Sequence, residues 1–176
     1  LLEQMRSAGV QVERFHEPHW SHWDNMNNRT HRKLLVVDGS VGFTGGVGIA
    51  DQWQGDARNP QEWRDTHYRV TGPVVAQMQA VFLDNWVRAT GRVLHGEAYF
   101  PALKPAGDYT AQVFSSSPQG GSESMQLMYL LAITAARNTI ALSNSYFVPD
   151  ELTIRTLLDA ARRGVKVRVI VPSGHI

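Results

Sequence analysis

The sequence predicts an α/β protein with a mixed, largely parallel sheet flanked by helices. Residues 111–172 alternate between strand and helix patterns, and alternating units of this kind build parallel strands covered by helices. Residues 34–44 instead show a hairpin pattern, which adds antiparallel pairing. The chain has 176 residues, of which 43% are apolar and 19% charged. This size and composition are typical of a soluble globular protein with one ordinary domain or two small ones.

The first half of the chain is expected to contain a hairpin and one long amphipathic helix. Asp38 and Gly39 form a turn signal between two short apolar runs. Pro73 suits the first turn of a helix, and Gly91 follows the last turn. The apolar stripe of this helix consists of Val74, Val75, Met78, Val81, Phe82 and Trp86. The expected elements are a helix end over 1–8 that stops at Gly9, strands over 10–15, 34–37, 41–44 and 65–70, and a helix over 71–91.

The second half follows a connector that is rich in proline and glycine. Ser122 and Asp150 are candidate N-caps of two helices, and Gly164 is the stop of the second helix. The residues expected to face inward are Leu127, Leu130, Leu131 and Ala135, with Ile133 at the edge, and then Ile154, Leu157, Leu158 and Ala161. The expected elements are strands over 111–117, 139–147 and 165–172 and helices over 122–137 and 151–163.

The beginning and the end of the chain echo each other. Residues 1–15 and 157–170 both contain a helix tail, a glycine stop and a Val-x-Val strand. Coincidence is one reading, because helix–glycine–strand is common in α/β proteins. If the echo is real, the chain is a fragment that starts inside one copy of a repeat and ends at the same point of a second copy.

Composition excludes several classes of site. The sequence has no cysteine, so disulfides and thiolate metal sites are absent. The net charge of +1 gives no overall attraction to nucleic acid or to anionic lipid. No apolar run reaches the roughly 18–20 residues of a membrane span, and no signal peptide is visible.

His31 and Lys33 stand out at the start of the expected strand over 34–37. Side chains two residues apart in a strand point to the same face, so an imidazole and an ammonium are aimed at one place. A neutral imidazole can attack phosphorus, and an ammonium can neutralise a phosphate oxygen. An ordinary solvent-exposed strand start is the alternative reading of the same pair.

These residues belong to a longer motif. His31, Lys33 and Asp38 fit the pattern H-x-K-x-x-x-x-D, and Gly45-Gly46 follows where glycines close it. This motif resembles that of the phospholipase D superfamily. The stretches NNRTHRKLLVVDGSVGFTGG, WRDTHYRVTGPVVAQMQAVFLDNW and SYFVPDEL are most similar to the bacterial cardiolipin synthase branch, so the resemblance spans nearly the whole chain.

The resemblance implies a phosphatidyltransferase with two such motifs that face each other. One histidine would form a phosphohistidine and the other would act as acid and then as base, without a metal or other cofactor. The substrate would be a phospholipid, phosphatidylglycerol in the case of cardiolipin synthesis. The full-length protein would then be associated with a membrane, namely the bacterial inner membrane or its cytoplasmic face.

The resemblance also implies a division of the chain. Residues 1–94 would be the C-terminal part of a first phospholipase D-like half and 95–109 a connector. Residues 110–176 would be the N-terminal part of a second half, whose own motif is expected beyond Ile176. The chain alone should then be inactive, unless two copies pair their His31 groups.

The carboxylate of the motif is predicted to be structural. Asp38 lies seven residues after His31, which is roughly 23 Å along a strand, and it falls in the expected turn. Asp65 is the better candidate for orienting an imidazole, with Glu62 second, since related proteins place an acidic residue some thirty positions after the histidine. Gly45 and Gly46 are expected to let backbone N–H groups approach the phosphate together with Lys33.

Other functions stay open at this point. A hydrolase of the same superfamily, either a phospholipase or a nuclease, would use the same residues, although a nuclease should show a basic groove. A module that binds phosphate or membrane without catalysis is a further alternative. The sequence does not identify the nucleophilic histidine, the acceptor alcohol or the oligomeric state. His16, His19 and His22 have a spacing that suits zinc on a helix, but Pro18 argues against a helix there, so no metal site is predicted.

Overall fold

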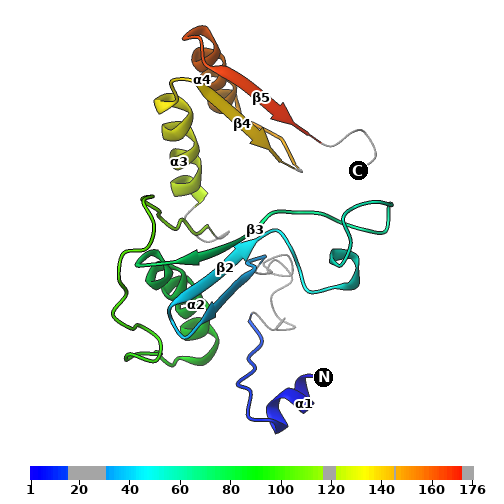
Figure 1. Ribbon diagram of the computed structural model, residues 1–176, viewed down its shortest axis with the longest axis vertical. Coiled ribbons are helices and arrows are strands. Elements are labelled where there is room, and N and C mark those ends of the chain that lie inside the picture. The colour runs from blue at the N-terminus through cyan, green and yellow to red at the C-terminus, as the bar shows by residue number, and fades with distance from the viewer. Residues whose placement is uncertain (16–30, 117–121, 145, 172–176) are drawn as a thin grey trace, which may run out of the picture. The chain divides into compact units, whose positions relative to one another are not determined.

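The computed structural model describes residues 1–15, 31–116, 122–144 and 146–171. The chain forms two compact units, Leu1–Val113 and Phe114–Ile176. Figure 1 shows the helices and strands of both units along the chain. The elements are α1 (Leu2–Ser7), β1 (Leu34–Val37), β2 (Val41–Gly45), η2 (Asp51–Trp53), β3 (His67–Thr71), α2 (Val74–Thr90), α3 (Ser122–Ala135), β4 (Thr139–Ser143), α4 (Glu151–Arg162) and β5 (Lys166–Ile170).

The first unit contains a three-stranded antiparallel sheet in the order β1-β2-β3. Val37 pairs with Val41 across the hairpin, and Gly45 pairs with His67 at the other end of the sheet. Asp38 and Gly39 both adopt positive φ, 51° and 58°, as a hairpin turn of the primed type requires. The predicted hairpin is therefore confirmed, and its turn chemistry explains it.

Helix α2 covers one face of this sheet and contacts all three strands (Figure 1). Val75 and Met78 are its buried apolar residues, at 0% and 2% exposure. Gly42 lets the helix approach β2, because a Cβ atom there would lie only 2.4 Å from the Met78 sulfur. The helix ends at Gly91, whose φ of 68° is the left-handed cap that the sequence predicts.

The second unit is built around one strand–helix–strand segment. Strands β4 and β5 pair in parallel, with Thr139 opposite Lys166, and α4 connects them. The core of this unit consists of Ile133, Ala160 and Val165, with Ala136, Ile140 and Leu157 packed against it. Asp150 caps α4, since its carboxylate accepts the Thr153 N–H at 2.7 Å.

The structure is a mixed α/β protein, but a single, largely parallel sheet is not confirmed. The described strands form two small sheets, one antiparallel and one parallel. The antiparallel arrangement of the first sheet follows from its connections: a tight turn joins β1 to β2, and the described segment between β2 and β3 holds only the short η2 turn rather than a crossover α-helix. The division into two repeat halves stays a prediction.

Two predicted strands and parts of the predicted helix stripes are wrong. Residues 10–15 and the described residues 111–116 form no regular strand, because a β pattern needs a partner that no described segment provides. On α3 the buried residue is Ile133, whereas Leu127 and Leu131 are more than half exposed. On α4 the small Ala160 is buried and Leu158 is half exposed, since the described part of this unit offers two strands and one other helix to cover an apolar stripe.

Candidate active site

Three chain segments meet at one end of the antiparallel sheet. The start of β1, the end of β2 and the start of β3 are neighbours, as the pairs Leu34–Thr44 and Gly45–His67 show. The segments that flank these strand ends are 31–33, 45–46 and 65–66. Most of the site residues predicted from the sequence therefore lie at the same end of the sheet.

His31 and Lys33 contact each other in front of β1. The Lys33 Nζ atom lies 3.2 Å from His31 Nε2 and 3.4 Å from the His31 carbonyl oxygen. His31 is exposed, and Lys33 is partly buried. A protonated lysine can donate to Nε2 only when that nitrogen carries no proton, so this contact fits a neutral imidazole with its proton on Nδ1. In this arrangement the Nε2 lone pair accepts the Lys33 hydrogen bond, so it becomes available to attack phosphorus only when the ammonium moves away.

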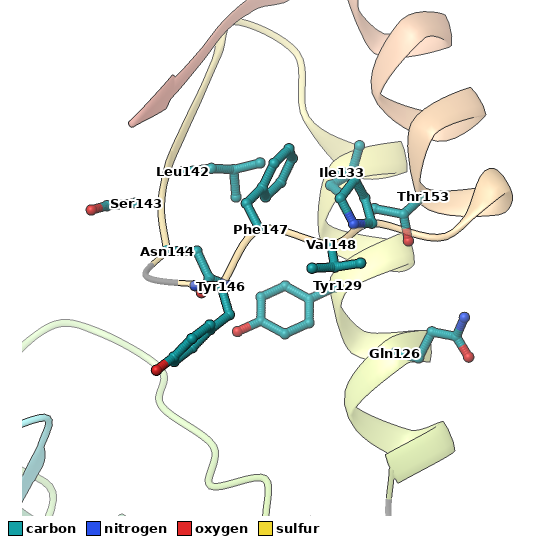
Figure 2. A pocket seen from close by; sticks show the side chains of 11 residues that line it. Gln126, Tyr129, Ile133, Leu142, Ser143, Asn144, Tyr146, Phe147, Val148 and Thr153 are labelled. Carbon is teal, nitrogen blue, oxygen red and sulfur yellow. Dashed lines mark hydrogen bonds between the residues drawn. The ribbon is translucent and has the colours of Figure 1, made fainter. Parts of the chain in front are cut away.

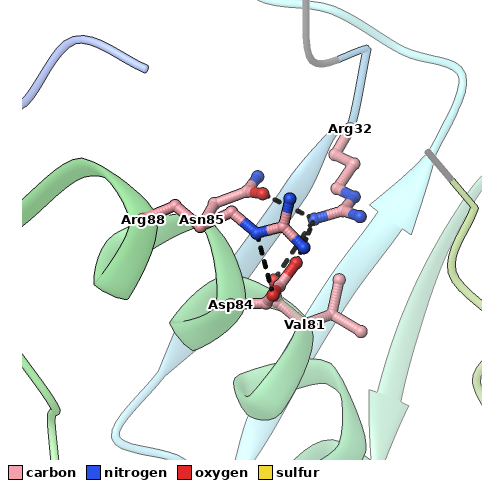
Figure 3. Close-up of polar contacts among 5 residues, drawn as sticks. All are labelled: Arg32, Val81, Asp84, Asn85 and Arg88. Atoms are coloured by element: carbon pink, nitrogen blue, oxygen red, sulfur yellow. Dashed lines mark hydrogen bonds and ion pairs between the residues drawn. The ribbon is translucent and has the colours of Figure 1, made fainter. Parts of the chain in front are cut away.

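Arg32, between these two residues, points to helix α2. Its Nη1 atom donates to Asn85 Oδ1 at 2.8 Å and to the Val81 carbonyl oxygen at 3.5 Å, and it lies 3.7 Å from Asp84 Oδ2. Figure 3 shows the guanidinium above the last turns of α2, where Arg88 holds the same Asp84 at 3.2 Å. The segment 31–33 is thus attached to the helix that covers the sheet.

Asp65 packs against Gly46. A Cβ atom at Gly46 would lie 1.8 Å from Asp65 Oδ2, so only glycine leaves room for this carboxylate. Asp65 Oδ1 accepts the Thr66 N–H at 2.6 Å, and the Thr66 carbonyl accepts the Gly46 N–H at 3.1 Å. The Gly46 N–H, which the sequence assigns to a phosphate, is therefore already used within the fold.

Glu62, the second candidate for orienting an imidazole, forms hydrogen bonds within the loop in which it lies. Its carboxylate accepts the N–H groups of Arg58 and Asp56, both at 3.1 Å, and the Asn59 side-chain amide at 2.8 Å. These hydrogen bonds lower the pKa of Glu62 below its ordinary value, and the one from the Arg58 N–H contributes most. Glu62 is thus an ionised organiser of the loop 55–62.

Asp38 lies at the opposite end of the sheet from His31. All of β1, which spans roughly 13 Å at about 3.3 Å per residue, lies between the two positions, together with Arg32 and Lys33. The turn packs against the connector, since a Cβ atom at Gly39 would lie 2.4 Å from the Tyr99 carbonyl oxygen. The left-handed conformation of Asp38 is one that aspartate tolerates better than most residues. The structure therefore separates Asp38 from the other predicted site residues.

The histidines that were considered and rejected as zinc ligands lie outside the described residues. His16, His19 and His22 all lie in the segment 16–30, which the structure does not describe. Within the described ranges, no group of three or more histidine, cysteine, aspartate or glutamate side chains is placed to hold a metal ion.

A separate pocket lies within the second unit, at the carboxyl end of β4. It has a volume of about 210 Å³. Its lining includes Tyr129, Phe147 and Val148, whose side chains Figure 2 shows beside one another, together with Asn144 and Gln126. The carboxyl ends of parallel strands are a common place for ligands in α/β proteins. None of the predicted catalytic residues lines this pocket.

Arg32 is the site residue that the sequence analysis missed. One signal for it was present: strand alternation places Arg32 on the face opposite His31 and Lys33. Its partners Val81, Asp84 and Asn85 are about fifty positions away, and only the folded structure brings them together.

Comparisons with known proteins agree with the predicted resemblance. Residues 129–175 match the family model described as cardiolipin synthase, PLD-like domain. The chain is 36% identical over 172 residues to cardiolipin synthase A of Pseudomonas putida, with 97% of this chain and 35% of the relative covered. It is 37% identical over 173 residues to cardiolipin synthase A of Pseudomonas fluorescens, with 98% and 36% covered. It is 36% identical over 177 residues to the cardiolipin synthase of Alkalihalophilus pseudofirmus, with 98% and 35% covered.

The chain spans about a third of the length of the curated relatives it matches. No solved structure matches it at a significant level. Within the described ranges, no helix has both the length and the apolar character needed to cross a bilayer. The resemblance to the phospholipase D superfamily, and within it to the bacterial cardiolipin synthases, is confirmed by these matches.

Proposed function

Because the chain resembles bacterial cardiolipin synthases over nearly all of its length, we propose that the full-length protein transfers phosphatidyl groups and makes cardiolipin from phosphatidylglycerol. The observation that carries this proposal within the chain is the contact between Lys33 Nζ and His31 Nε2 at 3.2 Å. It joins a potential nucleophile and a phosphate-binding cation in one place. The proteins named above as cardiolipin synthases supply the choice of substrate.

The proposed reaction has two displacements. In the first, an imidazole nitrogen attacks the phosphorus of phosphatidylglycerol, a P–N bond forms and the P–O bond to glycerol breaks. A second imidazole, protonated, gives its proton to the departing glycerol. In the second, the hydroxyl of another phosphatidylglycerol attacks the phosphohistidine, the P–N bond breaks and the hydroxyl proton returns to the second imidazole. His31 is the nucleophile or the acid in this scheme.

The other residues at this end of the sheet have supporting roles. Lys33 neutralises a phosphate oxygen, and this role needs only a small movement of its flexible ammonium away from His31. Gly45 lets the end of β2 pack closely against the Thr66 carbonyl beside the proposed phosphate site, and Gly46 leaves room for Asp65. Asp65 orients an imidazole through Oδ2, since Oδ1 accepts the Thr66 N–H, whereas Glu62 accepts hydrogen bonds from its own loop. Asp38 shapes the hairpin turn and takes no part in the chemistry.

This scheme places the full-length protein at a membrane surface, since its substrates are lipids. The second motif that the mechanism needs would come from another part of the same polypeptide or from a second copy of the chain. No metal ion takes part in either displacement, because Lys33 and the two imidazoles supply the charge and the protons.

Product analysis tests the proposal. The full-length protein would be incubated with phosphatidylglycerol that is labelled in the glycerol headgroup, in mixed micelles, and the lipids and free glycerol would be separated. Cardiolipin and glycerol in equal amounts are expected. Phosphatidic acid with glycerol would indicate a hydrolase, and cleavage of an oligonucleotide without any lipid product would indicate a nuclease. Lipid binding without turnover would indicate a non-catalytic module.

A further inference from the structure

The segment 31–33 lies ahead of the sheet rather than within it. The ladder of hydrogen bonds between β1 and β2 starts at Leu34, which pairs with Thr44. Residues just outside a strand ladder lack its backbone hydrogen bonds and open more easily than residues within it. Side-chain contacts of segment 31–33 are therefore needed to hold His31 in a fixed position.

Arg32 supplies the attachment. Its side chain is only 23% exposed, and Nη1 contacts an amide oxygen, a carbonyl oxygen and a carboxylate of α2. The amide contact, to Asn85 Oδ1, is 2.8 Å long. Arg32 thus reaches three acceptors at positions 81, 84 and 85 of α2, which lie on one face of the helix, as Figure 3 shows.

The partner helix is a firm support. α2 has 17 residues and is anchored to the sheet by Val75 and Met78, both almost fully buried. Asp84 also pairs with Arg88, one turn further along the helix, but both side chains are about half exposed, so this pair adds little to the support. A side chain bound to this helix is thereby fixed relative to β1, because α2 contacts β1 directly.

Because side chains alternate along an extended chain, the binding of Arg32 to α2 also determines the direction in which His31 and Lys33 point. Neighbouring residues of an extended chain point to opposite faces, so Arg32 on the helix side directs its two neighbours to the other side. The contact between Lys33 Nζ and His31 Nε2 agrees with this, since both side chains lie together. The same backbone could not bind α2 through Arg32 and direct His31 toward the helix.

We infer that Arg32 is a positioning residue, which aims His31 and Lys33 at the reacting phosphate by binding Asn85 and Asp84 of α2. This inference rests on the proposed function for its catalytic consequence. It adds a residue outside the histidine, lysine and aspartate of the motif, together with two helix residues through which that residue acts. Arg32 itself does not touch the substrate.

The test compares Arg32→Ala with Arg88→Ala in the full-length protein acting on phosphatidylglycerol in mixed micelles. Arg88→Ala is the matched control, because it removes an arginine from the same Asp84 without touching segment 31–33. Arg32→Ala should lower kcat roughly 10- to 100-fold with KM little changed, the size of effect that misplacing a reacting group produces. Arg88→Ala should retain the kcat of the wild type. A raised KM with unchanged kcat in Arg32→Ala would overturn the inference, since Arg32 would then bind substrate.

Two further variants show whether Arg32 acts through the helix. Arg32→Lys keeps the charge but replaces the planar guanidinium, whose Nη1 makes all three contacts, by an ammonium of different reach and geometry, so it should recover only part of kcat. Asn85→Ala should lower kcat, and adding it to Arg32→Ala should cost little more, because both changes break one connection. Independent, multiplying losses would contradict the proposed path through Asn85.

A measurement without turnover separates this inference from the proposed function. Hydrogen exchange at residues 31–33 should be faster in Arg32→Ala than in the wild type and in Arg88→Ala. Unchanged exchange and unchanged kcat in Arg32→Ala, with His31→Ala inactive, would overturn only the positioning role. Full activity of His31→Ala would overturn the proposed function, while faster exchange in Arg32→Ala would still show the structural attachment.

Discussion

At the scale of single residues, each neighbour of His31 in the motif has a different partner. Lys33 turns to the imidazole, and Arg32 turns to helix α2. Asp38, the third letter of the motif, occupies a turn at the other end of the strand. The residues that the motif names are therefore not equivalent: two of them lie together in front of β1, where we propose the chemistry takes place, and one lies in the hairpin turn.

The first prediction concerns the carboxylate beside Gly46. Asp65→Asn in the full-length protein should lower kcat about 10²-fold or more, because an amide carries no charge to hold an imidazole in its protonated form. The measurement is the rate of cardiolipin formation at saturating phosphatidylglycerol. Asp51→Asn, a change of the same kind at an exposed position of η2, is the matched control and should retain the rate of the wild type.

Glu62 provides the contrasting variant to Asp65. Glu62→Gln should reduce activity less than Asp65→Asn, because Glu62 contacts only donors of its own loop. A larger loss in Glu62→Gln than in Asp65→Asn would reverse the two assignments.

The second prediction is a pH dependence of the loop 55–62. The pKa of Glu62 is lowered from 4.5 by the N–H groups of Arg58 and Asp56. Since the folded-state pKa is the lower one, the ionised carboxylate contributes its full stabilisation above pH 4.5 and loses it as the pH falls through the folded-state pKa. The amide proton signals of Arg58 and Asp56 should therefore titrate in NMR spectra with a midpoint below 4.5. The Glu62→Gln variant should lack this titration, and a midpoint above 4.5 would contradict the assignment.

At the scale of elements, the contact between β2 and α2 determines where the site can form. Gly42 and Met78 meet so closely that no larger residue fits on the strand. The face of the sheet that carries them is therefore covered, and the opposite face is open at Leu35 and Val37, which are 56% and 42% exposed. By alternation, His31 and Lys33 project on this open face.

The third prediction follows from this contact. Gly42→Ala should lower the free energy of unfolding by about 1–3 kcal/mol, as overpacking does, and Met78→Ala by about 2–5 kcal/mol through the cavity it leaves. The double variant should lose less than the sum, because each change relieves the problem that the other creates. Denaturant unfolding of the four proteins provides the measurement. Strictly additive losses would show that the two residues do not share one contact.

At the scale of the whole molecule, the sequence predicts well those elements that are specified by residues within or next to them. The hairpin and α2 could be predicted because an Asp-Gly turn and a terminal glycine specify them within a few residues. The strands over 10–15 and 111–117 could not be judged in this way, because a strand exists only with a partner, and the chain alone does not say which segment that is. The buried sides of α3 and α4 depend for the same reason on how many neighbours cover them.

The candidate site shows the same limit. His31, Lys33 and Asp65 can be found from spacing and alternation, since these are local or follow the resemblance. The connection from Arg32 to Asn85 joins residues 53 positions apart and becomes visible only in the folded chain. The use of the Gly46 N–H by Thr66 is likewise a property of the neighbouring strand.

The most direct test of the account is the activity of His31→Ala beside that of His95→Ala, both in the full-length protein with labelled phosphatidylglycerol. His95 is an exposed histidine in the connector and serves as the matched control. The account predicts that His31→Ala forms no detectable cardiolipin and that His95→Ala forms as much as the wild type. Cardiolipin formation by His31→Ala at the rate of the wild type would contradict the claim that the segment in front of β1 carries out the transfer.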